Sequence, residues 1–170
     1  MLHFARTTLT GVFVLSIASS AYANWKHTDW GMTLEQIGVD GHLKVQVVAD
    51  GAQRKDPVLG EVLAEAPYEL LAHPGHEGMF EFLFENDHLV GVRDTFPNFD
   101  PDKTLKSLIE AYGIPVAVID GSGRRDWCWI DWNNRNKVWY TLFHGPSLAY
   151  ETILYTSALN PAGCDFTTNH

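Results

Sequence analysis

The sequence lacks the short motifs that identify many enzymes. It has no glycine-rich loop of the P-loop or dinucleotide-binding type, and no nucleophile elbow around a serine. A Gly-rich basic stretch at residues 121–125 precedes an expected strand, so it lacks the helix N-terminus that binds phosphate. The sequence therefore predicts no cofactor. It leaves open whether the chain is an enzyme and favours a non-enzymatic role.

Basic residues are few. Lys and Arg number 12 against 21 Asp and Glu, which gives the 170-residue chain a formal net charge of −9 at pH 7. An acidic chain repels nucleic-acid phosphates and anionic lipid headgroups. We therefore expect no nucleic-acid partner, whereas a basic protein partner is compatible with this charge.

The sequence also lacks an apolar run long enough to cross a bilayer. A shorter apolar segment, residues 9–17, follows Arg6 and precedes Ala-Tyr-Ala at 21–23, a pattern that suits signal-peptide cleavage. We assign residues 1–23 to a signal peptide and expect a periplasmic or secreted protein. A buried N-terminal helix is the alternative. No cysteine follows the cleavage point directly, so a lipid anchor there is not expected.

Cysteine is scarce, since the chain contains Cys128 and Cys164 alone. Exported proteins meet oxidising conditions, which favours a disulfide between the two. It would tie the C-terminal tail to the strand expected at 125–132 and stabilise the fold by about 3–4 kcal/mol on the chain-entropy account. The alternative is two separate thiols. A catalytic cysteine is disfavoured, because the tryptophans flanking Cys128 form an apolar setting that opposes the reactive thiolate.

Two stretches carry helix signals. Thr33 is suited to cap a short helix, with Gln36 at the capping-box position. The stronger signal covers residues 101–112, where Asp100 precedes a proline and apolar residues recur at helical spacing. Gly113 is expected to end this helix.

Alternation of apolar and polar residues predicts two groups of three strands, with a tight turn at Asn86 and Asp87. The first group is 68–73, 78–84 and 89–96, and the second is 125–132, 137–145 and 147–157. Residues 50–66 are polar and interrupted by Gly and Pro, so we expect a loop with at most one helical turn there. Residues 42–48 fit a strand or a helix equally.

Residues 78–89 can be aligned with residues 137–148 so that apolar positions and turns coincide. This alignment predicts an internal duplication. The expected fold class is α+β, with two tandem helix-then-three-strand units that form an antiparallel sheet with helices on one face. The units span residues 24–96 and 97–158, and residues 159–170 form a C-terminal tail.

The segment Asp-Trp-Gly-Met-Thr-Leu-Glu-Gln-Ile at 29–37, with Phe-Glu-Phe-Leu-Phe-Glu-Asn-Asp-His-Leu-Val-Gly-Val at 80–92, resembles a family of small exported bacterial proteins. The architecture resembles the β-lactamase-inhibitor-protein fold and the small lipoproteins of the outer-membrane assembly machinery. The resemblance implies a helix layer on an antiparallel sheet and a role in binding protein. This chain lacks the lipoproteins' lipidation cysteine and a recognisable inhibitory loop, so no binding residue is carried over.

A hydrolytic site is the first alternative to a binding role. His73, His76 and Glu77 carry side chains that ligate zinc. Their spacing is not that of a helical zinc motif, and the intervening Pro-Gly favours a solvated turn. Glu81 and Glu151 would offer paired carboxylates only if they shared one face of the sheet. A metal- or carboxylate-dependent hydrolase therefore stays open, without an assigned catalytic or metal-binding residue.

Tryptophans gather in the second group of strands. Alternation places Trp127 and Trp129 on one face and Cys128 and Trp132 on the other. Because helices cover one face only, we predict that some of these aromatic residues are exposed, and we name Trp127, Trp129 and Tyr140 as binding residues. The predicted function is an exported, non-catalytic module that binds an unidentified protein of the cell envelope. Glycan stacking on the tryptophans, or their complete burial, are the alternatives, and no oligomeric state is predicted.

Overall fold

The computed structural model of the chain describes residues 24–26, 28–39, 45–56, 59–67, 78–96, 100–145, 149–160 and 164. Within these ranges the helices are α1 (Leu34–Val39) and α2 (Pro101–Tyr112). The strands before α2 are β1 (Asn24–Trp25), β2 (Thr28–Asp29), β3 (Gln46–Val47), β4 (Arg54–Asp56), β5 (Gly60–Pro67), β6 (Met79–Glu85) and β7 (His88–Phe96). The strands after α2 are β8 (Ala117–Gly121), β9 (Arg124–Asp131), β10 (Asn136–His144) and β11 (Ala149–Ser157). Neither described helix is long and apolar enough to cross a membrane.

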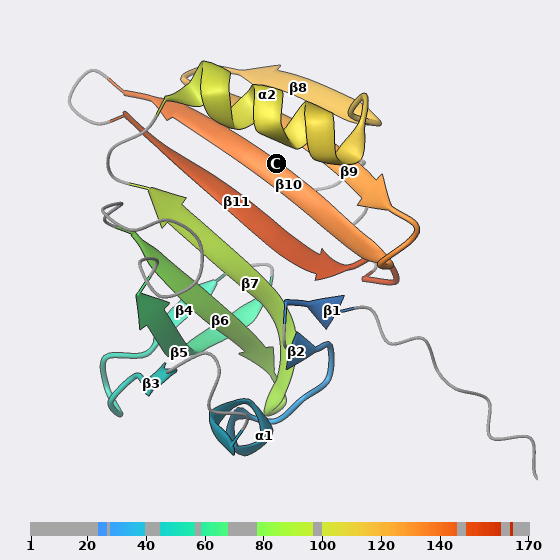
Figure 1. Ribbon diagram of the computed structural model, residues 1–170. Helices are drawn as coiled ribbons and strands as arrows, with labels where there is room; N and C mark the ends of the chain where they lie inside the picture. Colours follow the sequence, from blue (N-terminus) through green and yellow to red (C-terminus); the bar gives the residue numbers. More distant parts are fainter. Residues whose placement is uncertain are drawn as a thin grey trace, which may run out of the picture.

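The described strands form one nine-stranded antiparallel sheet and a small β1–β2 ribbon, which confirms the predicted antiparallel sheet (Figure 1). The order in the large sheet is β3-β5-β6-β7-β11-β10-β9-β8, with β4 also paired to β5. The chain reaches β7 at the middle of the sheet, starts again at the far edge with β8, and works inward to β11. Strands β7 and β11 therefore pair at the centre, with Arg93 opposite Leu154.

The predicted α+β class, built from helix-then-three-strand units, is wrong, because the described chain is mainly β. Strands β4 and β5 occupy the segment that we expected to be a loop, and β8 lies between α2 and β9, where no strand was expected. In β5 the buried positions are Val62, Ala64 and Ala66, and alanine gives only a weak strand signal. Of the predicted strands, 68–73 lies outside the described residues. The residues of 42–48 that form a strand are Gln46 and Val47.

The helix ends match the sequence prediction. The carboxylate of Asp100 accepts a hydrogen bond from the Lys103 backbone N–H at 3.2 Å, and the Gly113 N–H closes the last turn of α2. At α1 the Thr33 N–H donates to Gln36 Oε1 at 2.8 Å, and the Gln36 N–H donates to Thr33 Oγ1 at 3.3 Å. This reciprocal pair is a capping box, which satisfies N–H groups that the first turn leaves unpaired. Both helices therefore begin where local side chains stabilise their ends.

The tight turn between β6 and β7 is also confirmed. Asn86 and Asp87 have φ angles of 50° and 64° and separate the paired residues Glu85 and His88. Asn and Asp tolerate this left-handed region better than other non-glycine residues. A second hairpin, β10–β11, occupies the segment that we aligned with this one. The internal duplication itself stays a prediction.

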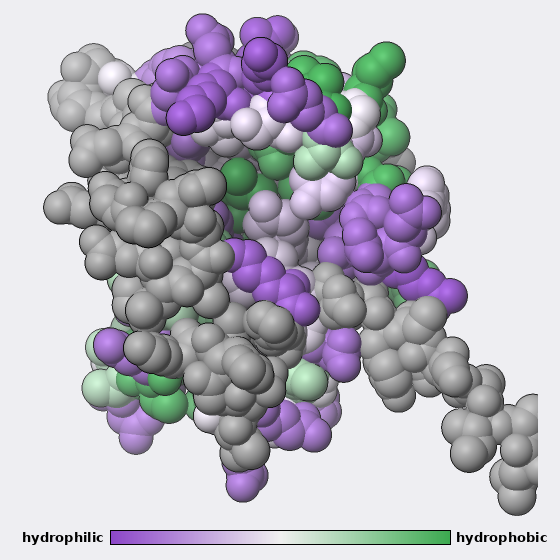
Figure 2. All heavy atoms as spheres, in the orientation of Figure 1, coloured by the Kyte–Doolittle hydropathy of each residue, from purple (hydrophilic) through white to green (hydrophobic). Residues whose placement is uncertain are grey.

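The main core lies between the helices and one face of the sheet. Ile37 of α1 and Leu108 of α2 belong to the same buried cluster as the aromatic residues of β6, β9 and β10. Trp25 of β1 joins it and packs on Phe80, with 4.9 Å between ring centroids. Figure 2 shows hydrophilic residues over the outer surface of α2. The helices therefore cover this face, which we call the helix-covered face, and the opposite side of the sheet is the reverse face.

Candidate functional site

The three predicted binding residues, Trp127, Trp129 and Tyr140, belong to the buried core of the helix-covered face. Trp129 is 1% exposed, and its indole N–H donates to the Gly113 carbonyl at 2.9 Å. Trp127 stacks on Tyr140 with ring centroids 5.0 Å apart. Trp127 and Trp129 share one face, as strand alternation predicts, and Tyr140 joins them through the register, but the structure buries all three. They do not line a surface that a partner could reach.

The expected exposure of these residues is therefore corrected. The sequence predicts that some of these aromatic residues face away from the helices. The register places Trp127 opposite Tyr140 and Trp129 opposite Val138, all on the face that α2 covers. The tryptophan on the reverse face is Trp139, which lies opposite Cys128. Strand alternation alone does not show which of the two faces of a strand packs against a helix.

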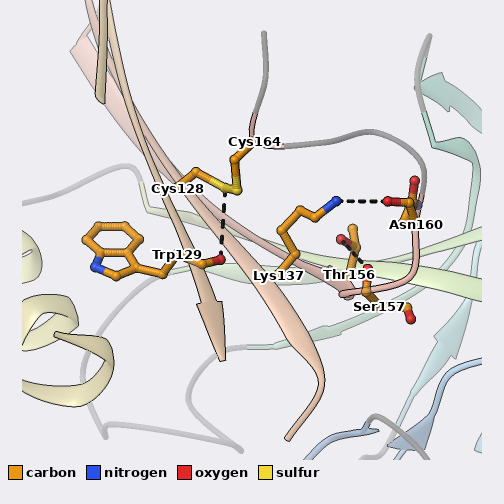
Figure 3. The surroundings of a disulfide bond; sticks show 7 residues. All are labelled: Cys128, Trp129, Lys137, Thr156, Ser157, Asn160 and Cys164. Carbon is orange, nitrogen blue, oxygen red and sulfur yellow. Dashed lines mark hydrogen bonds between the residues drawn. A yellow bond between two sulfur atoms is a disulfide. The ribbon is translucent and has the colours of Figure 1, made fainter. Parts of the chain in front are cut away.

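The predicted disulfide between Cys128 and Cys164 is confirmed. Figure 3 shows Cys128 directed to one side of β9 and the Trp129 indole to the other. The chain that follows β11 is also held by Lys137, whose Nζ donates to the Asn160 carbonyl at 2.8 Å. Both attachments lie on the reverse face, so Asn160 and Cys164 are held there.

A cluster of acids and hydroxyls joins α2 to the sheet on the helix-covered face. Tyr140 donates from its hydroxyl to Glu151 Oε2 at 2.5 Å, and Thr104 of α2 donates to Glu151 Oε1 at 2.8 Å. Burial raises the pKa of Glu151, which these two hydrogen bonds partly oppose. Burial and the bond to Glu151 also raise the pKa of Tyr140. Because Glu151 is buried, we interpret the cluster as a structural link between helix and sheet.

Asp94 is a second buried acid on the same face, opposite Ile153 and Phe80. Its Oδ1 has no hydrogen-bond partner among the described residues. Burial raises the pKa of Asp94 to about 8, with Lys26 opposing the shift and Glu151 adding to it. The carboxyl group is therefore largely protonated at neutral pH, which removes the free-energy penalty of an ionised buried carboxylate.

A groove of about 390 Å³ runs across the reverse face. The hydrogen-bonded register builds its floor from cross-strand rows of side chains. One row is Glu81, Arg93, Leu154 and Trp139, from β6 to β10, and the next is Thr95, Thr152 and Thr141, from β7 to β10. This size lies in the range of clefts that accept small ligands or single side chains of a partner.

Aromatic rings form one end of this groove. Phe143 of β10 and Tyr150 of β11 face each other and stack, with centroids 4.4 Å apart and 18° between ring planes. The guanidinium of Arg124 lies 5.4 Å from the Phe143 centroid. Trp139 completes the aromatic lining. The groove therefore offers flat apolar surfaces beside a row of threonines.

The charged residues of the groove pair with one another. Arg93 contacts Glu81 at 2.8 Å and Asp56 at 3.0 Å. Arg124 contacts Asp126 at 2.7 Å. The buried Asp126 carboxylate also accepts a hydrogen bond from the hydroxyl of Thr141. Opposite charges hold both arginine side chains in place, so the groove carries little net charge.

The other predicted sites do not assemble. His73, His76 and Glu77 lie outside the described residues, and the described residues contain no group of three His, Cys, Asp or Glu that could hold a metal ion. Glu81 lies in the row of the reverse face, whereas Glu151 belongs to the helix-covered face. These two carboxylates therefore cannot act as a pair. The Gly-rich stretch at 121–125 forms the end of β8, the turn between β8 and β9, and the start of β9.

Reasoning from the sequence missed the groove as a site. A usable signal was present in β10, where Trp139, Thr141 and Phe143 alternate with the apolar Val138, Tyr140 and Leu142. Mixed aromatic and polar residues on one phase of a strand indicate a face that meets both apolar groups and water. The arginines and acids from other strands join this face only through the tertiary register.

Comparisons with known proteins found no family model, curated protein or solved structure that matches the chain. The resemblance to exported inhibitor-like and assembly lipoproteins therefore stays a prediction.

Proposed function

We propose that the chain is an exported, non-catalytic protein of the cell envelope that binds another protein through the groove of its reverse face. The observation that carries the proposal is the composition of this groove, where Trp139 and Tyr150 lie beside Arg93 and Arg124. Tryptophan, tyrosine and arginine are the residues most enriched where protein interfaces concentrate their binding energy. The proposed docking surface therefore lies on the reverse face of the sheet. It does not include the buried residues Trp127, Trp129 and Tyr140.

The arrangement of charges supports a protein ligand. Arg93 and Arg124 are already oriented by carboxylates, so binding does not have to order these long side chains. The paired charges leave the groove close to neutral, which suits an apolar or aromatic side chain of a partner with hydrogen-bonding backbone around it. Thr95 and Thr152 line the floor and carry hydroxyl groups for that backbone.

The disulfide is consistent with export. Disulfides persist in oxidising compartments and are rare in the cytosol. Together with the predicted signal peptide at residues 1–23, the Cys128–Cys164 bond supports a periplasmic or secreted protein.

The test is site-specific photo-crosslinking in intact cells. A photoreactive residue at Thr152, in the groove, is compared with one at Lys106, on the outer surface of α2. We expect a defined protein adduct from position 152 and none from position 106. Adducts of equal yield at both positions, or none at either, would contradict the proposal.

Matched tryptophan variants sharpen this test. Trp139→Ala is expected to abolish the adduct, whereas Trp132→Ala, in the exposed turn between β9 and β10, is expected to leave it unchanged. If Trp139→Ala fails to fold, Thr95→Arg replaces it, because a bulky side chain on the floor would fill the groove while position 152 keeps the photoreactive residue. Titration with cell-wall glycans monitors the alternative, since a Trp139-dependent fluorescence change without a protein adduct would indicate glycan binding.

A further inference from the structure

The two edges of the large sheet differ in length and chemistry. One edge is formed by β3 and β4, which contribute two and three residues, and β4 carries Arg54, Lys55 and Asp56. Very short strands and charged residues are the usual protection of a sheet edge against pairing with other chains. The other edge is β8, with five residues, and β8 pairs with β9 and with no other described strand. Strand β8 is longer than β3 and β4 and carries one charged residue, Asp120, so this edge is less protected than the first edge.

Exposed apolar side chains surround the β8 edge. Ile109 in the last turn of α2 is 42% exposed, and Ile114 and Val116 in the connection are 87% and 59% exposed. Val118 of β8 itself is 46% exposed. Figure 2 shows hydrophobic residues gathered where α2 ends and β8 begins. A contiguous group of this kind beside an unpaired edge is typical of a protein interface rather than of a free surface.

The charges at this edge are balanced. Asp120 of β8 pairs with Arg125 of β9 at 2.7 Å, and both side chains are well exposed. The edge therefore has no net local charge, although the whole chain carries −9. Two copies of an acidic chain repel each other at long range, and a neutral apolar edge is where they can approach most closely.

We propose that β8 of one copy pairs in antiparallel orientation with β8 of a second copy, which joins their two sheets in a symmetric dimer. A partner that pairs with the backbone of β8 must be an extended strand with a free edge of its own. The exposed side chains beside β8 favour a partner surface that is apolar and uncharged. Strand β8 itself has all of these properties. A two-fold axis satisfies both copies at once and leaves only the protected β3–β4 edges at the ends of the joined sheet.

Sedimentation velocity of the purified protein, over a range of about 1 to 100 µM, tests the proposal. We expect a reversible dimer, and we expect Val118→Lys to raise the dissociation constant at least about tenfold, because a lysine on an edge strand opposes pairing. Val47→Lys makes the same change on the opposite edge, where Val47 of β3 is 67% exposed, and should leave the dimer intact. Ile114→Ser, which alters an exposed side chain next to β8, should weaken the dimer without affecting folding.

Hydrogen exchange identifies the surface that forms the dimer. Backbone amides of β8 should become more protected as the concentration rises, whereas amides of β3 and β4 should not. Added salt should tighten the dimer, because it screens the repulsion between acidic chains. A monomer throughout the concentration range overturns the proposal, and so does an equal response to Val118→Lys and Val47→Lys. Trp139→Ala should leave association unchanged, so failure of the groove to bind protein is distinguishable from failure of this dimer.

Discussion

The two faces of the sheet hold the same residue types in opposite settings. Trp129 of β9 is enclosed under α2 and donates its indole N–H to the Gly113 carbonyl, whereas Trp139 of the neighbouring strand β10 lines a groove on the reverse face. Asp94 is buried on the helix-covered face and Asp126 on the reverse face. One face is a core and the other a candidate docking surface, and a shift of one residue along a strand separates the two roles.

The largest expected change in stability concerns the two buried aspartates. Asp94 has its pKa raised to about 8, so the native state holds a proton that the unfolded chain releases at lower pH. The contribution of this group to the free energy of unfolding should therefore be highest below about pH 4. It should fall by about 1.4 kcal/mol per pH unit as the pH rises toward 8. Asp94→Asn should remove this slope and be more stable than the parent at pH 9, as measured by urea unfolding at several pH values.

Asp126→Asn is the matched variant on the reverse face. Arg124 and Thr141 both bind this carboxylate, so the substitution should destabilise the fold by about 1–3 kcal/mol. If Asp94→Asn were destabilising at pH 9, or if both variants behaved alike there, the assignment of Asp94 as a protonated buried acid would be wrong.

The next largest change in stability is expected for the two tryptophans. Trp129→Ala should destabilise the protein by about 3–5 kcal/mol, because it leaves a cavity under α2 and removes the bond to Gly113. Trp139→Ala should lower the free energy of unfolding by less than half as much, since Trp139 is only partly buried. Chemical denaturation followed by far-ultraviolet circular dichroism compares them. Equal losses would mean that both faces serve as core.

Removal of the disulfide tests how much the attachment of Cys164 to the reverse face stabilises the protein. Replacing Cys128 and Cys164 together by alanine opens a loop with a sequence separation of 36. The expected loss is about 3–4 kcal/mol, since the unfolded chain regains the freedom that the bond removes. Thermal unfolding with and without a reductant provides the measurement, and the alanine variant should not respond to the reductant. A loss below about 1 kcal/mol would show that the tail contributes little to the fold.

The smallest change in stability is expected for the N-terminal cap of α2. Asp100→Ala removes the acceptor for the Lys103 N–H and should destabilise the protein by about 1 kcal/mol. Because α2 lies on the helix-covered face, crosslinking from Thr152 in the groove should be unchanged. A loss of the adduct in this variant would show that the two faces are coupled, which the structure gives no reason to expect.

Much of the fold was predictable where a few neighbouring residues decide the conformation. The cap at Asp100, the turn at Asn86 and Asp87, and the alternation in β6 and β9 to β11 were all visible in the sequence. The strands that were missed have weak local signals. Alanines occupy buried positions of β5, and β8 is a short edge strand that directly follows a helix and a proline. Pairing with neighbours, rather than propensity, makes these segments strands.

The candidate site was less predictable than the fold. Alternation correctly separates Trp127 and Trp129 from Cys128, but the docking surface predicted from the sequence lies on the side that α2 covers. The groove needs Arg93 from β7, Trp139 from β10 and Tyr150 from β11 to meet in one register. Their proximity depends on the pairing of β7 with β11, which joins the two halves of the chain and has no signature in either strand alone.

The sequence by itself determined the helix ends, the hairpin turn, the alternating strands and, with two cysteines in the chain, the disulfide partners. The helix ends, the turn and the strands depend on residues close in the chain, and two cysteines can form only one disulfide. Only the tertiary structure decided which face of the sheet the helices cover, where the groove lies and which strands form the two edges of the sheet. A strand of alternating residues has two faces that differ by one position, and long-range packing decides which of them becomes the core.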